Sequence, residues 1–143
     1  MFDLMNNINP ILLFAPIAAQ TNSSAARASA IIDTQGYNSL TLVLVNGTNT
    51  DATATFAVTM EHGDSSTLAD TAVPATTDLI GTLALAGFTF ANDGTTRKLG
   101  YVGNKRYVRM TVTPTSNDNG DWFLAGIAIL GHPTHAPTSN PPA

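Results

Sequence analysis

The chain has 143 residues, enough for one domain with a buried core. Its net charge is −4 and it holds only six Lys and Arg residues, which excludes the broadly basic surface of a nucleic-acid-binding protein. Because it has no cysteine, disulfides and thiolate metal sites are also excluded. Charged residues make up 11% of the chain, against about 25% in a typical soluble domain. A surface this poor in charge favours burial against other protein subunits.

The first expected element is residues 1–26, whose apolar centre lies between Pro10 and Pro16. Both prolines oppose a helix and favour extended chain. Two interpretations are open: an edge strand of the domain itself, or an arm that packs on a neighbouring subunit. Burial of each apolar side chain is worth about 1.5–3 kcal/mol. We therefore take four of them as candidate interface residues, namely Ile11, Leu12, Leu13 and Phe14.

The same segment does not have the pattern of a signal peptide, because Asp3 is the only charge before its apolar run. The longest apolar stretch of the chain is also well short of the roughly 20 residues of a membrane-spanning helix. We expect a soluble protein that is made in a cytoplasm and has no membrane partner.

Residues 27–131 are predicted to form the folded domain. Alternation of apolar and polar residues predicts strands over 27–34, 39–47 and 53–63. Since about seven polar residues separate the second and third of these, we expect them to pair as antiparallel neighbours. A long polar loop over 64–78 follows, with Pro74 inside it.

The second half of the domain predicts a strand over 79–92, interrupted at Gly81 or Gly87, and a strand over 97–103 with a bulge at Gly100. Strict alternation over 105–113 predicts a half-buried strand, and the apolar run 122–130 predicts a strand covered on both faces. The intervening Asn119-Gly120 is typical of a tight turn, so we expect these two strands to form a hairpin. The tail 132–143, with four prolines, is expected to be extended.

Seven or eight short strands without a convincing helix predict an all-β fold, a two-sheet antiparallel β-sandwich. Jelly-roll wiring is our first choice and immunoglobulin-like wiring our second, because periodicity does not separate them.

Three groups of residues were considered for chemistry. His62 with Asp64, Ser65 and Ser66 lacks the ordered base of a catalytic triad. His132 and His135 flank Pro133 without an accompanying carboxylate, which favours an extended tail over a metal site. The acidic turn 117–121 lacks the spaced ligands of a calcium loop. We therefore expect no enzyme activity, no metal and no cofactor.

Two further clusters have two interpretations each. Lys105, Arg106 and Arg109 fall in one predicted strand; they form either a salt-bridged strand face or a contact patch for an acidic protein partner. Tyr101, Tyr107 and Trp122 form either interior packing or a sugar-binding platform.

Several tracts resemble a known family: FAVTMEHGDSSTLADTAVPATTDLIG, then GYVGNKRYVRMTVTP, then the apolar ending AGIAILGHP. The chain resembles the head decoration (cement) proteins of tailed bacteriophages over residues 39–133, with matching positions at Glu61–Asp64, Asp78–Gly81, Tyr101–Arg109 and Ala128–Pro133. The resemblance implies a β-sandwich on the capsid surface of the virion, a homotrimer, and the major capsid protein as partner. A head–tail or tail structural role, or a carbohydrate-binding adhesion module on the virion, is the alternative.

Overall fold

The computed structural model of the chain describes residues 3–142. Strands dominate it, with one four-residue α-helix and three single-turn 3-10 helices. In chain order the elements are η1 (Met5–Asn7), β1 (Ile8–Phe14), β2 (Gln20–Thr21), β3 (Arg27–Ala28), β4 (Ile32–Asp33), β5 (Tyr37–Asn49), β6 (Thr55–Gly63), η2 (Thr76–Asp78), β7 (Leu79–Ile80), α1 (Leu83–Ala86), β8 (Phe88–Thr89), η3 (Phe90–Asn92), β9 (Thr96–Tyr101), β10 (Tyr107–Thr115) and β11 (Asp121–Pro133).

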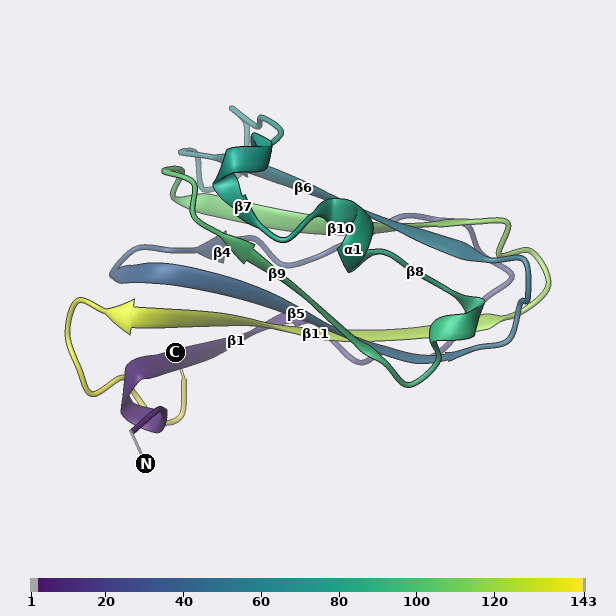
Figure 1. Cartoon of the computed structure of the whole chain (residues 1–143), viewed down its shortest axis with the longest axis horizontal. Helices are drawn as coiled ribbons and strands as arrows, with labels where there is room; N and C mark the ends of the chain where they lie inside the picture. Colours follow the sequence, from purple (N-terminus) through teal and green to yellow (C-terminus); the bar gives the residue numbers. More distant parts are fainter. Residues whose placement is uncertain (1–2, 143) are drawn as a thin grey trace.

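The strands form two sheets that face each other across one core (Figure 1). Sheet A has six strands in the order β1-β11-β5-β9-β7, with β2 also pairing with β11. Sheet B has five strands in the order β3-β10-β6-β8, with β4 also pairing with β10. Every pairing between these strands is antiparallel. The predicted all-β, two-sheet antiparallel sandwich is confirmed.

The order of the strands is that of a jelly roll. If β3 and β4 are counted as one interrupted strand, and the short strands β2 and β7 are set aside, eight strands remain. When these eight strands are numbered along the chain, their order across sheet A is 1-8-3-6 and their order across sheet B is 2-7-4-5. This is the double-sheet jelly-roll arrangement, so the first choice of wiring is correct and the immunoglobulin-like choice is not.

The two predicted strand pairings are wrong for the same reason. β10 and β11 do not form a hairpin, because β10 lies in sheet B and β11 in sheet A. β5 and β6 likewise lie in opposite sheets, where β5 pairs with β11 and β9 and β6 pairs with β10 and β8. In jelly-roll wiring these successive strands cross the sandwich, so a short polar connection between two strands does not make them neighbours.

Smaller features also differ from the sequence predictions. The strand expected over 79–92 is divided into β7, α1 and β8, with the divisions at Gly81 and Gly87. Gly100 makes no bulge, since β9 stays in register with β5 there. The run 122–130 is buried on one face only, and it alternates between buried and exposed residues.

The core lies between the sheets and is filled by the inward residues of the long strands. One part of the core is aromatic. The rings of Phe56 and Phe88 stack with their centroids 4.6 Å apart, and the centroid of the Trp122 ring lies 5.1 Å from that of Phe56. All three rings are buried. The pattern follows from alternation, because each strand sends every second side chain inward.

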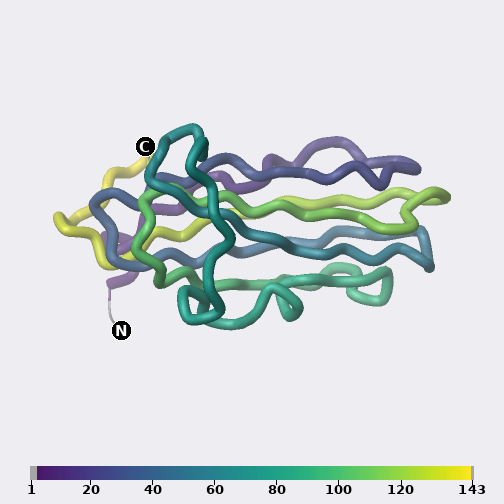
Figure 2. The backbone as a smooth tube through the Cα atoms, turned by 90° about the horizontal axis from the view of Figure 1, so that it is seen from above, coloured from purple at the N-terminus to yellow at the C-terminus, as the bar shows by residue number. Residues whose placement is uncertain are grey.

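Both ends of the described chain lie at the same end of the sandwich, as two perpendicular views agree (Figures 1 and 2). The Thr138 backbone N–H donates to the Asn6 carbonyl at 3.0 Å, and the Thr138 hydroxyl donates to the Ile8 carbonyl at 2.7 Å. Strand β11 runs on to Pro133, two residues beyond the boundary predicted for the domain. The tail therefore folds back along the start of β1.

Candidate functional site

The outer side of sheet A is covered mainly by apolar side chains. Strand register aligns Leu12, Ile127 and Val43 in one row across β1, β11 and β5. The neighbouring rows contain Pro10 with Ile129, and Ala125 with Val45. We call this surface the apolar face, defined by these residues: Pro10, Leu12, Val43, Val45, Phe123, Ala125, Ile127 and Ile129.

The apolar face is exposed to solvent in the isolated chain. The exposed fractions of its largest side chains are 54% for Leu12, 45% for Val45, 40% for Ile127 and 39% for Phe123. Gly47 lies beside Phe123, and a Cβ placed on the glycine would come within 2.7 Å of the Phe123 Cβ, so the position leaves no room for a larger residue. Soluble proteins seldom leave a contiguous apolar surface of this kind uncovered.

A hollow lies at each end of this side of sheet A. One, of about 170 Å³, is lined by Pro16, Ile17, Val45, Phe123 and Ala125 with Gly47. The other, of about 310 Å³, lies between the start of β1 and the ends of β5 and β11, and Leu4, Ile8 and Ile129 contribute to its lining. The surface therefore combines projecting side chains with depressions that apolar groups of a partner would fit.

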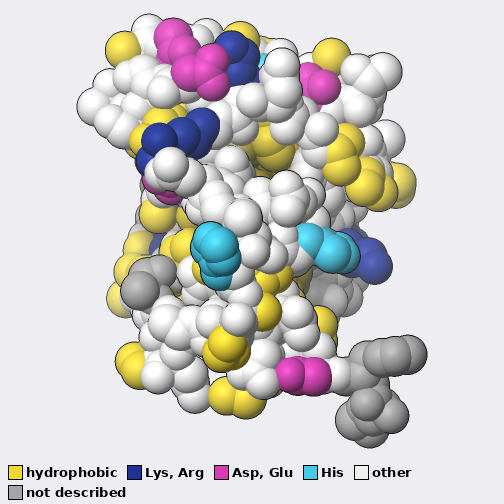
Figure 3. All heavy atoms as spheres, turned by 90° about the vertical axis from the view of Figure 1, so that its left-hand side faces the viewer, with side chains coloured by type: hydrophobic (Ala, Val, Ile, Leu, Met, Phe, Trp, Pro, Cys, Tyr) yellow, Lys and Arg dark blue, Asp and Glu magenta, His cyan; other side chains and the backbone are white. Residues whose placement is uncertain are grey.

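The outer side of sheet B has a different composition. Register places Thr111 opposite Thr59, Thr113 opposite Ala57, and Arg109 opposite Glu61. We call this the polar face, defined by Thr55, Ala57, Thr59, Glu61, Tyr107, Arg109, Thr111 and Thr113. Viewed from the end of the sandwich, acidic and basic side chains gather mostly on the side where sheet B and its loops lie (Figure 3).

The three basic candidate residues each form an ion pair within the chain. Arg109 Nε lies 2.5 Å from Glu61 Oε1, and Lys105 Nζ lies 2.6 Å from Asp64 Oδ2. Arg106 binds both oxygens of Asp33, at 2.8 and 2.7 Å. The salt-bridged interpretation therefore describes this structure, and these residues offer no unpaired positive patch.

These ion pairs lower the pKa of the carboxyl partners. Hydrogen bonds from Arg106 lower the pKa of Asp33, and those from Arg109 and then Thr71 lower the pKa of Glu61. The hydrogen bond from Lys105 lowers the pKa of Asp64. All three carboxylates are thus held in the charged form.

The four candidates of the N-terminal segment separate into two groups. Strand β1 is the edge strand of sheet A and pairs with β11 of the same chain. A register shift between Leu12 and Phe14 turns both Leu13 and Phe14 inward, where each is 2% exposed. Ile11 is partly buried against the core. Leu12 alone of the four belongs to the apolar face, so Leu13 and Phe14 are core residues in this fold rather than partner contacts.

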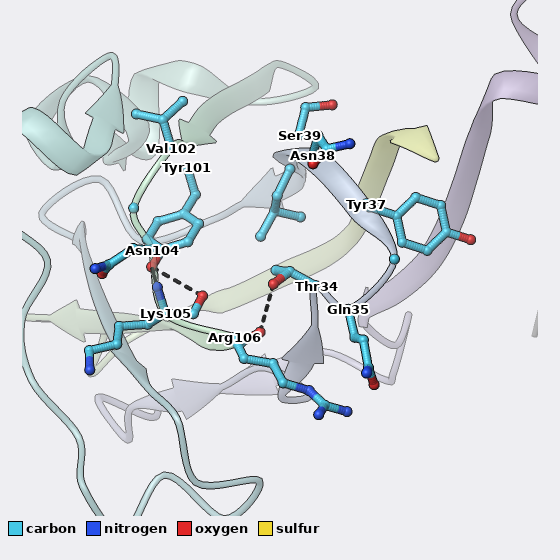
Figure 4. Close-up of a pocket in the computed structure, with 13 residues that line it drawn as sticks. Thr34, Gln35, Tyr37, Asn38, Ser39, Tyr101, Val102, Asn104, Lys105 and Arg106 are labelled. Atoms are coloured by element: carbon cyan, nitrogen blue, oxygen red, sulfur yellow. Dashed lines mark hydrogen bonds between the residues drawn. The ribbon is translucent and has the colours of Figure 1, made fainter. Parts of the chain in front are cut away.

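A hollow of about 480 Å³ opens at the end of the sandwich, between the β4–β5 and β9–β10 loops (Figure 4). Its floor includes Leu40 and Tyr101, which are both buried. The Tyr101 hydroxyl accepts a hydrogen bond from the Lys105 backbone N–H at 3.0 Å, and the Thr34 hydroxyl donates to the Arg106 carbonyl at 2.9 Å. These bonds fix the two loops, and the ring of Tyr37 points away from Tyr101.

Of the two interpretations of the aromatic residues, the sugar-binding platform does not describe this structure. Trp122 is 0% exposed and Tyr101 is 4% exposed, so neither presents a ring to a sugar. Tyr107 is half-buried and the Arg106 guanidinium lies 4.9 Å from its ring centre. The interior-packing interpretation describes Trp122 and Tyr101.

The residues considered for catalysis or metal binding are held apart. His62 is buried and its Nδ1 lies 2.9 Å from the Tyr101 hydroxyl, whereas Asp64 pairs with Lys105. His132 Nδ1 lies 2.9 Å from the Ser39 hydroxyl. Among residues 3–142, no three His, Asp or Glu side chains are grouped to hold a metal ion, and no helix is long and apolar enough to cross a membrane.

One buried polar site was not anticipated from the sequence. The Asp51 carboxylate accepts hydrogen bonds from the Thr53 hydroxyl at 2.7 Å and from the backbone N–H groups of Thr53, Asp118 and Asn119. These bonds, with those to Thr53 first, lower the pKa of Asp51 to about 2. Gly120 is required beside it, because a Cβ there would lie 2.5 Å from the Asp51 backbone nitrogen. The turn 116–120 is thus a crossing between sheets fixed by Asp51.

No protein-family model matches the chain, and no curated protein matches it. Solved structures with a partial likeness include the N-terminal CBM22-1–GH10 modules of xylanase 10B from Clostridium thermocellum in complex with xylohexaose, with 14% identity, a TM-score of 0.41, and coverage of 89% of this chain and 26% of that chain. The structure of infectious bursal disease virus, Gx strain, has 11% identity and a TM-score of 0.44, and the match covers 91% of this chain and 35% of that chain. A family two carbohydrate esterase from Cellvibrio japonicus has 11% identity and a TM-score of 0.38, and the match covers 92% of this chain and 36% of that chain. The chain spans about a quarter to a third of each of these chains, and the likeness concerns the fold alone.

Sequence reasoning missed most of the apolar face. The unbroken apolar run 122–130 predicts a strand covered on both sides, which places Phe123 and Ile127 in the interior. The signal was present in a different form: the outward positions 123, 125, 127 and 129 are all apolar, whereas the outward positions of β10 are mostly Thr and Arg. Strand β11 thus has apolar residues on both sides, and its outer side is open in the isolated chain.

Proposed function

We propose that this chain is a virion structural protein that decorates and stabilises the capsid shell of a tailed bacteriophage, and that it is not an enzyme. The observation that carries the proposal is the apolar face, which spans β1, β11 and β5 and lies open in the isolated chain. Such a surface supports a protein that works in contact with other subunits. The family resemblance stated above names the setting.

The architecture suits a cross-linking role. Long strands such as β5 and β11, of 13 residues each, make a stiff two-layer body. A rigid body that touches several capsid subunits at once gains avidity from the sum of weak contacts. The shell is stabilised because separating two capsid subunits then requires breaking the contacts of the decorating protein as well.

The carbohydrate-binding alternative loses two of its three aromatic residues, since Trp122 and Tyr101 are buried and only Tyr107 is partly exposed. A head–tail or tail role would use the same kind of surface in a ring with a different copy number. The position of the protein in an intact particle separates that role from decoration.

Binding to shells tests the proposal. Purified protein is mixed with expanded, genome-containing capsids of the phage that encodes it, and bound protein is measured after sedimentation. We expect saturable binding and a higher temperature of capsid disruption, with no effect on the capsid of an unrelated phage. Absence of binding, together with an unchanged disruption temperature, would remove the proposal.

A further inference from the structure

The apolar face lies open in the isolated chain. We infer that its occupant is a second copy of this chain, so that two chains pack apolar face to apolar face across a two-fold axis. The inference rests on the proposed function in one respect, because the protein must stay soluble before it attaches to the shell. It also rests on the area, charge and shape of the apolar face.

The area of the surface matches that of a stable interface. Strands β5 and β11 each have 13 residues, β1 has 7 and β9 has 6. At roughly 3.4 Å per residue and a strand spacing of about 4.8 Å, the outer side of these four strands covers on the order of 600 Å². Two copies would together bury about 1,200 Å², the lower end of the range for stable protein–protein interfaces.

The charge on this surface permits contact between identical copies. In a two-fold contact the same patch lies on both sides, so a patch with several like charges would repel itself. Among the described residues that point outward from the strands of sheet A, the charged ones are Lys98 and Asp121, which have opposite signs. Asp121 already accepts a hydrogen bond from the Thr21 hydroxyl at 2.5 Å. Although the chain carries −4 overall, two copies can meet here without repulsion.

The relief of this surface also suits a contact between copies. Leu12 and Ile80 project from sheet A with exposed fractions of 54% and 65%, and hollows of about 170 and 310 Å³ lie at the two ends of the same side. One copy therefore offers both projecting apolar side chains and apolar hollows on the same side, as a contact between identical surfaces requires. Face-to-face packing of sheets about 10 Å apart is a standard arrangement.

A second copy fits better than the shell as the occupant of this surface. A protein that attaches to a finished shell must first exist free in solution, where an open apolar surface of this size leads to aggregation. Pairing covers it before attachment, and leaves the polar face and the sandwich ends for the shell. A contact between identical patches closes at two copies, whereas the homotrimer implied by the resemblance needs two different patches on each copy.

The molecular mass of the purified protein in solution tests the inference, without any capsid present. At micromolar concentration, sedimentation equilibrium should give the mass of two chains for the wild type. Ile127→Asp places a charge at the centre of the apolar face and should halve the mass. Ala57→Asp is the matched control, because Ala57 is exposed on an inner strand of sheet B; it should keep the mass of two chains.

Cross-linking keeps the test decisive if the aspartate variant fails to fold. The chain has no cysteine. A reagent that joins two thiols can therefore link a single introduced cysteine only to the same cysteine of another copy. A short bis-maleimide should link Val43→Cys or Ile127→Cys into covalent dimers and leave Ala57→Cys unlinked. A wild-type mass of one or three chains, or cross-linking only through position 57, would overturn the inference. Since capsid binding is measured separately, failure here leaves the proposed function standing, and failure of capsid binding leaves the dimer standing.

Discussion

The two outer surfaces of the sandwich are built on the same strand geometry but from different residues. The polar face has threonines and an Arg109–Glu61 ion pair in register, whereas the apolar face has Leu12, Val45 and Ile127 in equivalent outward positions. Both sheets bury their inward side chains in one core. Folding therefore explains the inner faces of both sheets, and it explains the polar face, but it does not explain why the outer side of sheet A is apolar. That difference is what the proposed contact with other subunits accounts for.

The largest expected effect comes from removing the strand at the edge of the apolar face. Truncation of residues 1–14 deletes β1 and removes Leu13 and Phe14 from the core, a loss of about 1.5–3 kcal/mol for each side chain before the backbone ladder is counted. Because whole domains are stable by only about 5–15 kcal/mol, we expect circular dichroism to show an unfolded or strongly destabilised chain.

The matched control is Leu12→Ser, which changes the outward side of the same strand. At low protein concentration, where self-association does not contribute, it should leave the unfolding temperature close to that of the wild type. If the truncated chain instead kept a cooperative unfolding transition at the wild-type temperature, residues 1–14 would be a dispensable arm and the edge-strand account would be wrong.

Adjacent residues of β11 allow the inner and outer sides to be compared directly. Leu124→Ala opens a cavity in the core and should lower the free energy of unfolding by about 2–5 kcal/mol. Phe123→Ala removes a ring that is 39% exposed and should cost about 1 kcal/mol or less, when urea unfolding is measured at low protein concentration so that self-association does not contribute. Equal losses would mean that the two sides of β11 are equally buried in the single chain.

The Asp51 crossing should respond to acid. Its folded pKa of about 2 lies below the ordinary value of 3.8, so its charged form stabilises the fold above about pH 4, and that stabilisation is lost as the pH falls through about 2. Asp51→Asn should therefore unfold at a lower temperature than the wild type at neutral pH, and the difference should shrink as the pH approaches 2. Scanning calorimetry over pH 2–7 measures this. A difference that stays constant with pH would show that the charge of Asp51 is not the stabilising feature.

The smallest expected effect belongs to the polar face. The Arg109 and Glu61 side chains are 33% and 24% exposed, so water weakens their attraction. A double-mutant cycle with Arg109→Met and Glu61→Gln should give a coupling free energy of about 0.2–1 kcal/mol, falling in high salt. These variants should keep the wild-type mass in solution. Loss of self-association in either one would instead place the contact on sheet B.

The sequence predicted the strands better than it predicted their partners. Alternation locates β5, β6 and β10 within a few residues, because side-chain direction is a local property. Pairing is not local: β10 and β11 follow one another in the chain yet lie in different sheets. The partners of Lys105, Arg106 and Arg109 were equally out of reach, since each carboxylate lies more than 40 residues away in the chain.

The candidate surface was predicted in part for a related physical reason. The apolar segment before Pro16 was recognised, but the register shift between Leu12 and Phe14 sends two of its residues inward, and periodicity does not reveal such a shift. Conversely, the run 122–130 was assigned to a doubly covered strand, although one of its sides is open. Apolar residues on an open face and in a core have the same composition, and only the fold distinguishes them.

The most direct test of the account is electron microscopy of shells carrying the bound protein, at a resolution that traces the sheets. We expect the apolar face of every bound copy to be covered, with Leu12, Val43 and Ile127 packed against the same residues of a second copy. Bound copies whose apolar face lies open to solvent, while the polar face makes the contact with another subunit, would contradict it.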